Sequence, residues 1–168
     1  MQTESFTSLA ERLRDALLAC GWQLATAESC TGGWLAKVIT DLAGSSQWFE
    51  RGWVTYSNAA KQQQLGVDEA TLQAYGAVSA ATVQAMASGA LGRSQAQLTV
   101  AISGIAGPGG GTAEKPVGTV WLGYAGEDRA PEAEHFLFAG ERDAVRAQAV
   151  EAALRGLCER LDLGAGRG

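Results

Sequence analysis

Five side chains between positions 27 and 61 have chemistry suited to covalent catalysis: Ser29, Cys30, Ser46, Tyr56 and Lys61. Serine and cysteine are nucleophiles, and lysine and tyrosine can accept or donate the proton that a nucleophilic attack transfers. The only histidine of the chain, His135, lies far downstream. Covalent catalysis here would therefore use lysine or tyrosine as its proton acceptor. A hydroxyl nucleophile with a lysine base hydrolyses amides without histidine or metal.

Lys61 can act as a base only in a special environment. A free lysine has a pKa of about 10.4 and is almost wholly protonated at pH 7, so the amine must be desolvated or placed near another cation. Each candidate also has a plainer interpretation. Ser29 and Ser46 are residue types that cap helices and turns, Lys61 can be a solvated helix residue, and Tyr56 a half-buried strand residue.

A glycine-rich loop, G-I-A-G-P-G-G-G-T, spans residues 104–112. Glycines allow main-chain amides to approach a phosphate or a carboxylate closely. The loop does not end in G-K-[ST] and lacks the G-x-G-x-x-G register of dinucleotide-binding proteins, so neither nucleotide motif is present. The alternative is a flexible surface loop.

Composition places the chain among ordinary globular proteins. Its 168 residues are 46% hydrophobic and 18% charged, which predicts one domain with one core. The net charge of -5 argues against nonspecific binding to nucleic acid. We find no long apolar run and no leader pattern, and three widely spaced cysteines suggest neither disulfides nor a metal site. We therefore expect a cytoplasmic protein with reduced thiols, associated with no membrane.

The elements that position these residues alternate between helix and strand. We expect helices at 8–20, 34–42, 58–65, 68–75, 79–91 and 142–161, and strands at 22–27, 52–57, 98–103, 117–124 and 134–138. This order predicts a single three-layer α/β/α domain over residues 1–163, with a doubly wound central sheet of about four to six strands. Residues 164–168 are expected to form a frayed tail. The first nucleophile-bearing turn, A-E-S-C-T-G-G, lies between a strand and a helix, whose first amides are unpaired.

Long runs of the chain match a known family. The runs A-E-S-C-T-G-G-W-L-A-K, D-L-A-G-S-S-Q-W-F-E-R-G-W-V-T-Y-S-N-A-A-K, I-S-G-I-A-G-P-G-G-G-T-A-E-K-P-V-G-T-V-W and F-A-G-E-R-D-A-V-R closely resemble the CinA C-terminal domain family. The resemblance covers nearly the whole chain and is more specific than any single motif. Because the additional amino-terminal domain of full-length CinA proteins is not seen, the chain looks like the stand-alone nicotinamide-nucleotide amidohydrolases. The resemblance implies deamidation of nicotinamide mononucleotide to nicotinate mononucleotide and ammonia, no cofactor, and a homodimer.

The resemblance also implies roles for individual residues. Ser46 is expected to be the nucleophile and Lys61 the general base and later acid, with Tyr56 as a proton relay or orienter between them. Ser29 is the rival nucleophile or a bridging hydroxyl. The residues expected to hold the substrate are Thr31, Ser103, Gly104, Gly107 and Arg142, of which the guanidinium would bind the phosphate as a fork. The backbone amides of residues 29–31 are the candidates for stabilising the tetrahedral oxyanion.

Four other functions compete with this one. Glu28, Cys30 and Lys61 are the residue types of a cysteine amidase. The glycine loop and Arg142 would also suit a nucleotide-binding module without catalysis. A phosphotransferase is disfavoured because no nucleotide-triphosphate loop is present. A role in competence or damage responses follows only from the family's historical name.

Overall fold

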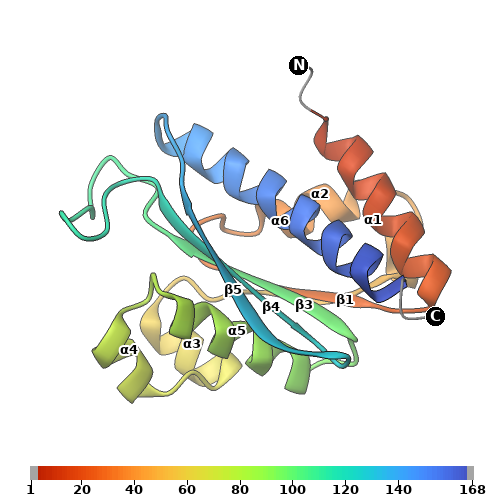
Figure 1. Ribbon diagram of the computed structural model, residues 1–168, viewed down its shortest axis with the longest axis horizontal. Helices are drawn as coiled ribbons and strands as arrows, with labels where there is room; N and C mark the ends of the chain where they lie inside the picture. Colours follow the sequence, from red (N-terminus) through yellow and green to blue (C-terminus); the bar gives the residue numbers. More distant parts are fainter. Residues whose placement is uncertain (1–3, 166–168) are drawn as a thin grey trace.

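The computed structural model describes residues 4–165 and has a five-stranded sheet between two layers of helices (Figure 1). This confirms the predicted α/β class. In chain order the elements are α1 (Phe6–Cys20), β1 (Leu24–Glu28), α2 (Trp34–Thr40), the 3₁₀ turn η1 (Ser45–Gln47), β2 (Phe49–Val54), α3 (Asn58–Leu65), α4 (Glu69–Tyr75), α5 (Ala80–Gly92), β3 (Leu98–Gly104), β4 (Thr119–Gly126), β5 (Arg129–Leu137) and α6 (Arg142–Ala165).

The sheet has the order β2-β1-β3-β4-β5, and only part of it is parallel. β1 runs parallel to β2 and to β3, whereas β4 and β5 are antiparallel to their neighbours. Helices connect β1 to β2 and β2 to β3, but the next two connections contain none, so each strand there returns in the opposite direction. The expected doubly wound plan therefore holds for one half of the sheet. The carboxyl ends of β1, β2 and β3 meet at one edge.

Two hydrophobic cores lie on the two faces of the sheet. On one face α1, α2 and α6 contribute buried residues such as Leu9, Leu35 and Leu154. On the other face α3, α4 and α5 contribute Leu65, Leu72 and Met86. Figure 1 shows these two groups of helices on opposite sides of the strands. The helices thus fix the sheet from both sides and leave the ends of its strands open.

Several element boundaries differ from those expected. α1 begins at Phe6 because the Ser5 side chain, and not Ser8, accepts the N-terminal hydrogen bond, from the Ser8 amide at 3.1 Å. β2 begins at Phe49 and ends at Val54, three residues earlier than expected, because the chain then turns to Ser57, the N-cap of α3. α6 continues to Ala165, so residues 164 and 165 are helical and not frayed. The remaining residues of that expected tail, 166–168, lie outside the described residues.

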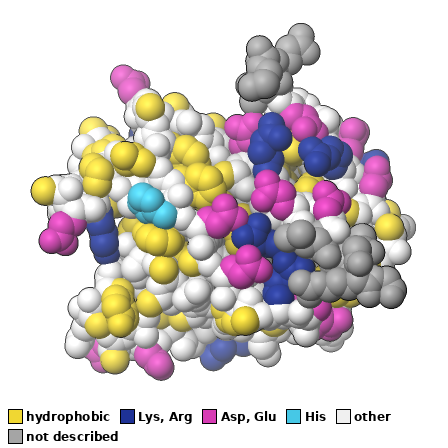
Figure 2. Space-filling view, in the orientation of Figure 1, with side chains coloured by type: hydrophobic (Ala, Val, Ile, Leu, Met, Phe, Trp, Pro, Cys, Tyr) yellow, Lys and Arg dark blue, Asp and Glu magenta, His cyan; other side chains and the backbone are white. Residues whose placement is uncertain are grey.

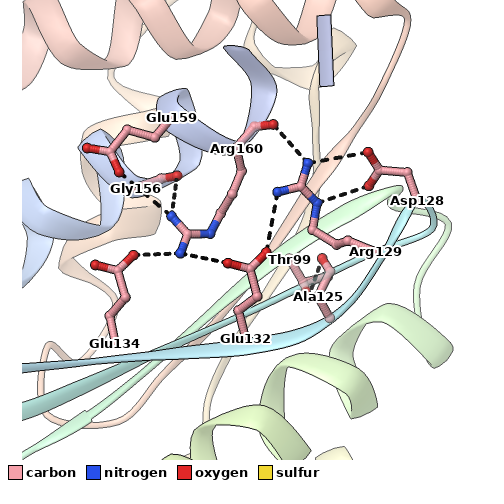
Figure 3. A network of polar contacts seen from close by, with 9 residues as sticks. All are labelled: Thr99, Ala125, Asp128, Arg129, Glu132, Glu134, Gly156, Glu159 and Arg160. Atoms are coloured by element: carbon pink, nitrogen blue, oxygen red, sulfur yellow. Dashed lines mark hydrogen bonds and ion pairs between the residues drawn. The ribbon is translucent and has the colours of Figure 1, made fainter. Parts of the chain in front are cut away.

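A buried arginine fastens α6 to the antiparallel half of the sheet (Figure 3). The Arg160 guanidinium donates to Glu132 and Glu134 of β5. It also lies 3.5 Å from the centroid of the Tyr124 ring. A Cβ atom at Gly156 would lie 1.8 Å from the Tyr124 hydroxyl oxygen, so glycine is needed for this close packing. These contacts fix the carboxyl half of the helix whose first residues belong to the site described below.

The surface is mixed in character. In the view of Figure 2, acidic and basic side chains are interspersed on the side of α1 and the carboxyl end of α6, and hydrophobic side chains are more frequent toward the opposite side. Among residues 4–165 no helix has the length and apolar character needed to cross a membrane.

Candidate active site

Lys61 and Ser29 meet at the carboxyl edge of the parallel strands. Ser29 directly follows β1, and Lys61 lies on the first turn of α3, which begins where the Ser57 side chain accepts from the Ala60 amide. The Lys61 side chain is 1% exposed, and its Nζ lies 3.1 Å from the Ser29 Oγ. Nζ also donates to the main-chain oxygens of Thr55 at 2.9 Å and Tyr56 at 3.3 Å. A lysine and a serine are therefore paired in a buried site.

The surroundings of Lys61 suit the uncharged amine. Burial lowers the pKa of Lys61 from its ordinary value of 10.5 and outweighs the opposing charge interaction with Cys30. An uncharged amine has two N–H groups and one lone pair. The two carbonyl oxygens can only accept, so they use both N–H groups. In the uncharged amine the lone pair is then left for the Ser29 O–H group, whereas the ammonium donates its third N–H to the Ser29 oxygen across the same 3.1 Å contact. This geometry would allow the uncharged amine to accept the Ser29 proton.

Ser46, expected to be the nucleophile, does not meet Lys61 within the chain. It is an exposed residue of η1, which precedes β2, whereas Lys61 is bonded to residues that follow β2. The six residues of β2 separate the two ends by about 20 Å at 3.3 Å per residue. Ser29, the expected rival, is therefore the serine that lies next to the amine.

Tyr56 is also placed differently from its expected role as a relay. Its side chain is 61% exposed, and its hydroxyl accepts from Nη2 of Arg142 at 3.3 Å. Only its main-chain oxygen reaches Lys61. Tyr56 thus helps to position the amine through its backbone, while its phenol lies with Arg142 at the outer side of the site.

Cys30 and Glu28 have structural surroundings. The Cys30 side chain packs in the core under α1, α2 and α6, and burial raises its thiol pKa to about 11, so the reactive thiolate is disfavoured. The Glu28 carboxylate accepts from the Thr31 hydroxyl at 2.6 Å and from the amides of Leu35 and Ala36 at 2.9 and 3.1 Å. Glu28 therefore caps α2. Among the described residues neither the Glu28 carboxylate nor the Lys61 amine is hydrogen-bonded to the Cys30 thiol, as a cysteine amidase would need.

Arg142 joins the glycine-rich loop to the site. Its Nη1 donates to the main-chain oxygen of Gly107 at 2.7 Å, next to a hollow of about 630 Å³. This hollow is lined by Ala106, Gly107, Pro108, Val117, Gly140, Glu141, Arg142 and Asp143. The structure therefore brings two of the expected substrate-binding residues, Gly107 and Arg142, together with Tyr56.

The other expected binding residues lie on β3 and in the turn that carries Ser29. Ser103 is buried at the end of β3, adjacent to Ser29, whose amide donates to the Ile102 oxygen at 2.9 Å. Gly104 has a packing reason for being glycine, since a Cβ there would lie 2.7 Å from a methyl group of Val120. The Thr31 hydroxyl is used by Glu28 and is not free for a substrate.

The amides of the nucleophile turn are not equivalent. The Ser29 amide donates to Ile102 and the Gly32 amide donates to the Ser29 oxygen at 3.1 Å, so neither is free for an oxyanion. The Thr31 N–H donates to no acceptor in the part of the chain that the structure describes. The Cys30 N–H likewise donates to no acceptor among these residues, so of the expected amides 29–31 those of Cys30 and Thr31 are available to an oxyanion.

Arg146 was not among the residues expected from the sequence. Its Nε donates to the Cys30 oxygen at 3.0 Å and its Nη2 to the Thr31 oxygen at 3.2 Å. The available signal was its spacing: it lies four residues after Arg142 and so on the same face of α6. Among residues 4–165, no three His, Cys, Asp or Glu side chains are grouped as they would be around a metal ion.

Comparison with known proteins gives close matches over the whole site. A family model described as CinA C-terminal domain matches residues 6–161. A relative named Nicotinamide-nucleotide amidohydrolase PncC from Escherichia coli K12 is 55% identical over 157 residues, 94% of this chain and 95% of the relative. One of the same name from Pseudomonas putida is 51% identical over 93% of this chain and 97% of the relative. The crystal structure of the competence/damage inducible protein CihA from Agrobacterium tumefaciens has a TM-score of 0.91 and 42% identity, covering 96% of this chain and 98% of that chain.

Proposed function

Because the chain belongs to the CinA C-terminal domain family, we propose that it is an amidohydrolase that converts nicotinamide mononucleotide to nicotinate mononucleotide and ammonia. The names of relatives that are 51% and 55% identical support this substrate. The observation that carries the chemistry is the buried pairing of the Lys61 amine with the Ser29 hydroxyl at 3.1 Å.

In the first half of the reaction the Ser29 oxygen attacks the carboxamide carbon while its proton passes to the Lys61 amine. An O–C bond forms and the carbonyl electron pair moves onto the oxygen. The C–N bond then breaks, and the Lys61 ammonium gives its proton to the departing nitrogen, which leaves as ammonia. The pyridinium of the substrate withdraws electrons from the carboxamide and so favours the attack.

In the second half a water molecule attacks the acyl carbon of the ester on Ser29. Lys61 takes the proton from that water and returns it to the Ser29 oxygen as the ester bond breaks. The product is the carboxylate, nicotinate mononucleotide. No metal or cofactor is required in either half.

The substrate's charged groups match the outer part of the site. Arg142 has a guanidinium that can bind a phosphate with two parallel hydrogen bonds, and it lies beside the hollow at Gly107. Tyr56, bonded to Arg142, offers an exposed ring near the pyridinium. The phosphate would bind at Arg142 and the carboxamide at Ser29.

The protein is further proposed to act in the cytoplasm as a homodimer, with no nucleic-acid or membrane partner. Leu137 on the edge strand β5 and Tyr75 of α4 are 63% and 59% exposed, and a second copy would cover such hydrophobic side chains. Light scattering during gel filtration measures this state. A mass of one chain at micromolar concentration would contradict the dimer.

The function is tested by incubating purified protein with nicotinamide mononucleotide and measuring both ammonia and nicotinate mononucleotide. We expect equal amounts of the two products, and the same rate with and without EDTA. Ser29→Ala should lower kcat by about 10³-fold or more. Ser46→Ala is the matched control, since it removes the same atom from the exposed η1 turn. Loss of turnover in Ser46→Ala with full turnover in Ser29→Ala would refute the assignment.

A further inference from the structure

The turn that carries Ser29 is held from two sides. It spans residues 29–33 and has no regular secondary structure. On one side the Glu28 carboxylate accepts from the Thr31 hydroxyl and from two amides of α2. On the other side the Arg146 guanidinium donates to the oxygens of Cys30 and Thr31. Two charged groups thus determine the direction of the peptide planes next to the nucleophile.

Arg146 is itself held in place. Its guanidinium lies 5.4 Å from the centroid of the Trp34 ring and 3.5 Å from a carboxylate oxygen of Asp143. Its side chain is 26% exposed, so it is largely shielded from solvent. A Cβ at Gly32 would lie 3.7 Å from Nη2 of Arg146, which is an ordinary van der Waals contact and places the guanidinium beside the turn.

The hydrogen bond from Arg146 to the Cys30 oxygen fixes the direction of the Thr31 amide. In a planar trans peptide the C=O of one residue and the N–H of the next point in opposite directions. Because the Cys30 oxygen points at Arg146, the N–H of Thr31 in the same peptide points away from it. Like the N–H of Cys30, this N–H has no acceptor among the described residues. A charge-assisted bond to the carbonyl also polarises the peptide and makes its N–H a stronger donor.

We propose that Arg146 is a positioning residue that directs and polarises the Thr31 N–H, which stabilises the oxyanion formed when Ser29 attacks a carbonyl. This inference rests on the proposed function for the identity of the substrate whose carboxamide is attacked. It does not rest on that function for the reactivity of Ser29. The negative oxygen of the tetrahedral intermediate accepts from the Thr31 N–H, and the hydrogen bond strengthens as the charge develops. Arg146 does not touch the substrate in this role.

The test compares Arg146→Met, Arg146→Lys and the control Arg155→Met. Methionine keeps an apolar stem against Trp34 but donates no hydrogen bond. Arg155 lies on the same helix, is 41% exposed and pairs with Glu151 and Glu4, away from the turn. We expect Arg146→Met to lower kcat by about 10²–10³-fold, the range for loss of an oxyanion donor, with KM within about threefold. Arg146→Lys should recover part of this loss because a lysine can donate to one of the two oxygens, and Arg155→Met should match the wild type.

A second measurement does not depend on the substrate. A fluorophosphonate probe labels an activated serine by forming an O–P bond as fluoride leaves, with the serine proton passing to Lys61. The labelled residue is identified by mass spectrometry. The rate of labelling of Ser29 should fall at least tenfold in Arg146→Met, while thermal unfolding confirms that the variant is folded.

The outcomes separate the two hypotheses. Wild-type turnover of nicotinamide mononucleotide with unchanged kcat in Arg146→Met would overturn the role of Arg146 and leave the proposed function intact. No turnover in the wild type, but slower labelling of Ser29 in Arg146→Met, would overturn the proposed substrate and support Arg146. A raised KM with unchanged kcat would make Arg146 a substrate-binding residue instead. Absence of Ser29 labelling in the folded wild type would refute the proposal.

Discussion

Replacement of Lys61 by methionine is expected to change the pH dependence of stability and of catalysis together. In the folded protein burial lowers the pKa of Lys61 from its ordinary value of 10.5. Between the lowered pKa and 10.5, the unfolded chain binds a proton at this lysine and the folded chain does not. The free energy of unfolding of the wild type therefore rises with pH across this interval. The methionine variant has no such proton.

The magnitude follows from the one proton involved. The difference in unfolding free energy, wild type minus Lys61→Met, should rise by about 1.4 kcal/mol per pH unit within the interval. It should be flat below the lowered pKa and flat again above 10.5. Because the variant shares every other titrating group, the difference isolates this amine. Lys37→Met, which removes an amine 70% exposed and paired with Asp41, controls for the loss of a surface lysine.

The assay combines urea unfolding at a series of pH values with steady-state kinetics over the same range. The kcat/KM of the wild type should rise about tenfold per pH unit below the lowered pKa and level off above it, since only the uncharged amine acts as a base. The bend in the kinetic profile should fall at the pH where the stability difference begins to rise. Lys61→Met should show at least about 10³-fold lower kcat at every pH. A stability difference that is independent of pH from 7 to 10.5 would refute the desolvated amine.

Three further substitutions test separate parts of the structure. Cys30→Ala should keep kcat within about threefold of the wild type, because the thiol is buried in the core and burial raises its pKa. A loss of kcat of about 10³-fold in the ammonia assay would instead support Cys30 as the nucleophile. Arg142→Lys should raise KM about tenfold with little change in kcat, because a lysine cannot form the two parallel bonds to a phosphate, and an unchanged KM would place the phosphate elsewhere. Gly156→Ala should destabilise the protein by about 1–3 kcal/mol in urea unfolding because its Cβ would overlap the Tyr124 hydroxyl, and Tyr124→Phe should relieve part of this cost. Equal stability of Gly156→Ala and the wild type would contradict the close packing.

Local signals predicted the helices better than the strands. α3 was predicted with its observed bounds because Ser57 caps its beginning and Gly66, at φ 71°, ends it. The strands were displaced by up to several residues, since their ends depend on pairing with neighbours. Phe49, for example, joins β2 because it pairs with Leu24 of β1, a contact between distant parts of the sequence.

The pairing of site residues could not be predicted from the sequence, because it also depends on contacts between distant parts of the chain. Ser29 and Ser46 both lie beside glycines, so each fits a turn with a nucleophile. Ser46 is closer to Lys61 along the chain, but the strand between them carries the two apart. Ser29, thirty-two positions from Lys61, is brought beside it by the parallel pairing of β1 and β2.

The strand order explains why the site lies where it does. β1 has β2 on one side and β3 on the other. The connection from β1 to β2 passes over one face of the sheet through α2. The connection from β2 to β3 passes over the other face through α3, α4 and α5. Chains that leave neighbouring strands toward opposite faces open a crevice at the carboxyl ends, where ligands bind in open α/β sheets. Ser29 ends β1 at this point, and its amide is bonded to β3. Had the strand order been known, this rule would have selected Ser29 over Ser46 without any side-chain coordinates, because only Ser29 follows a strand at the crevice.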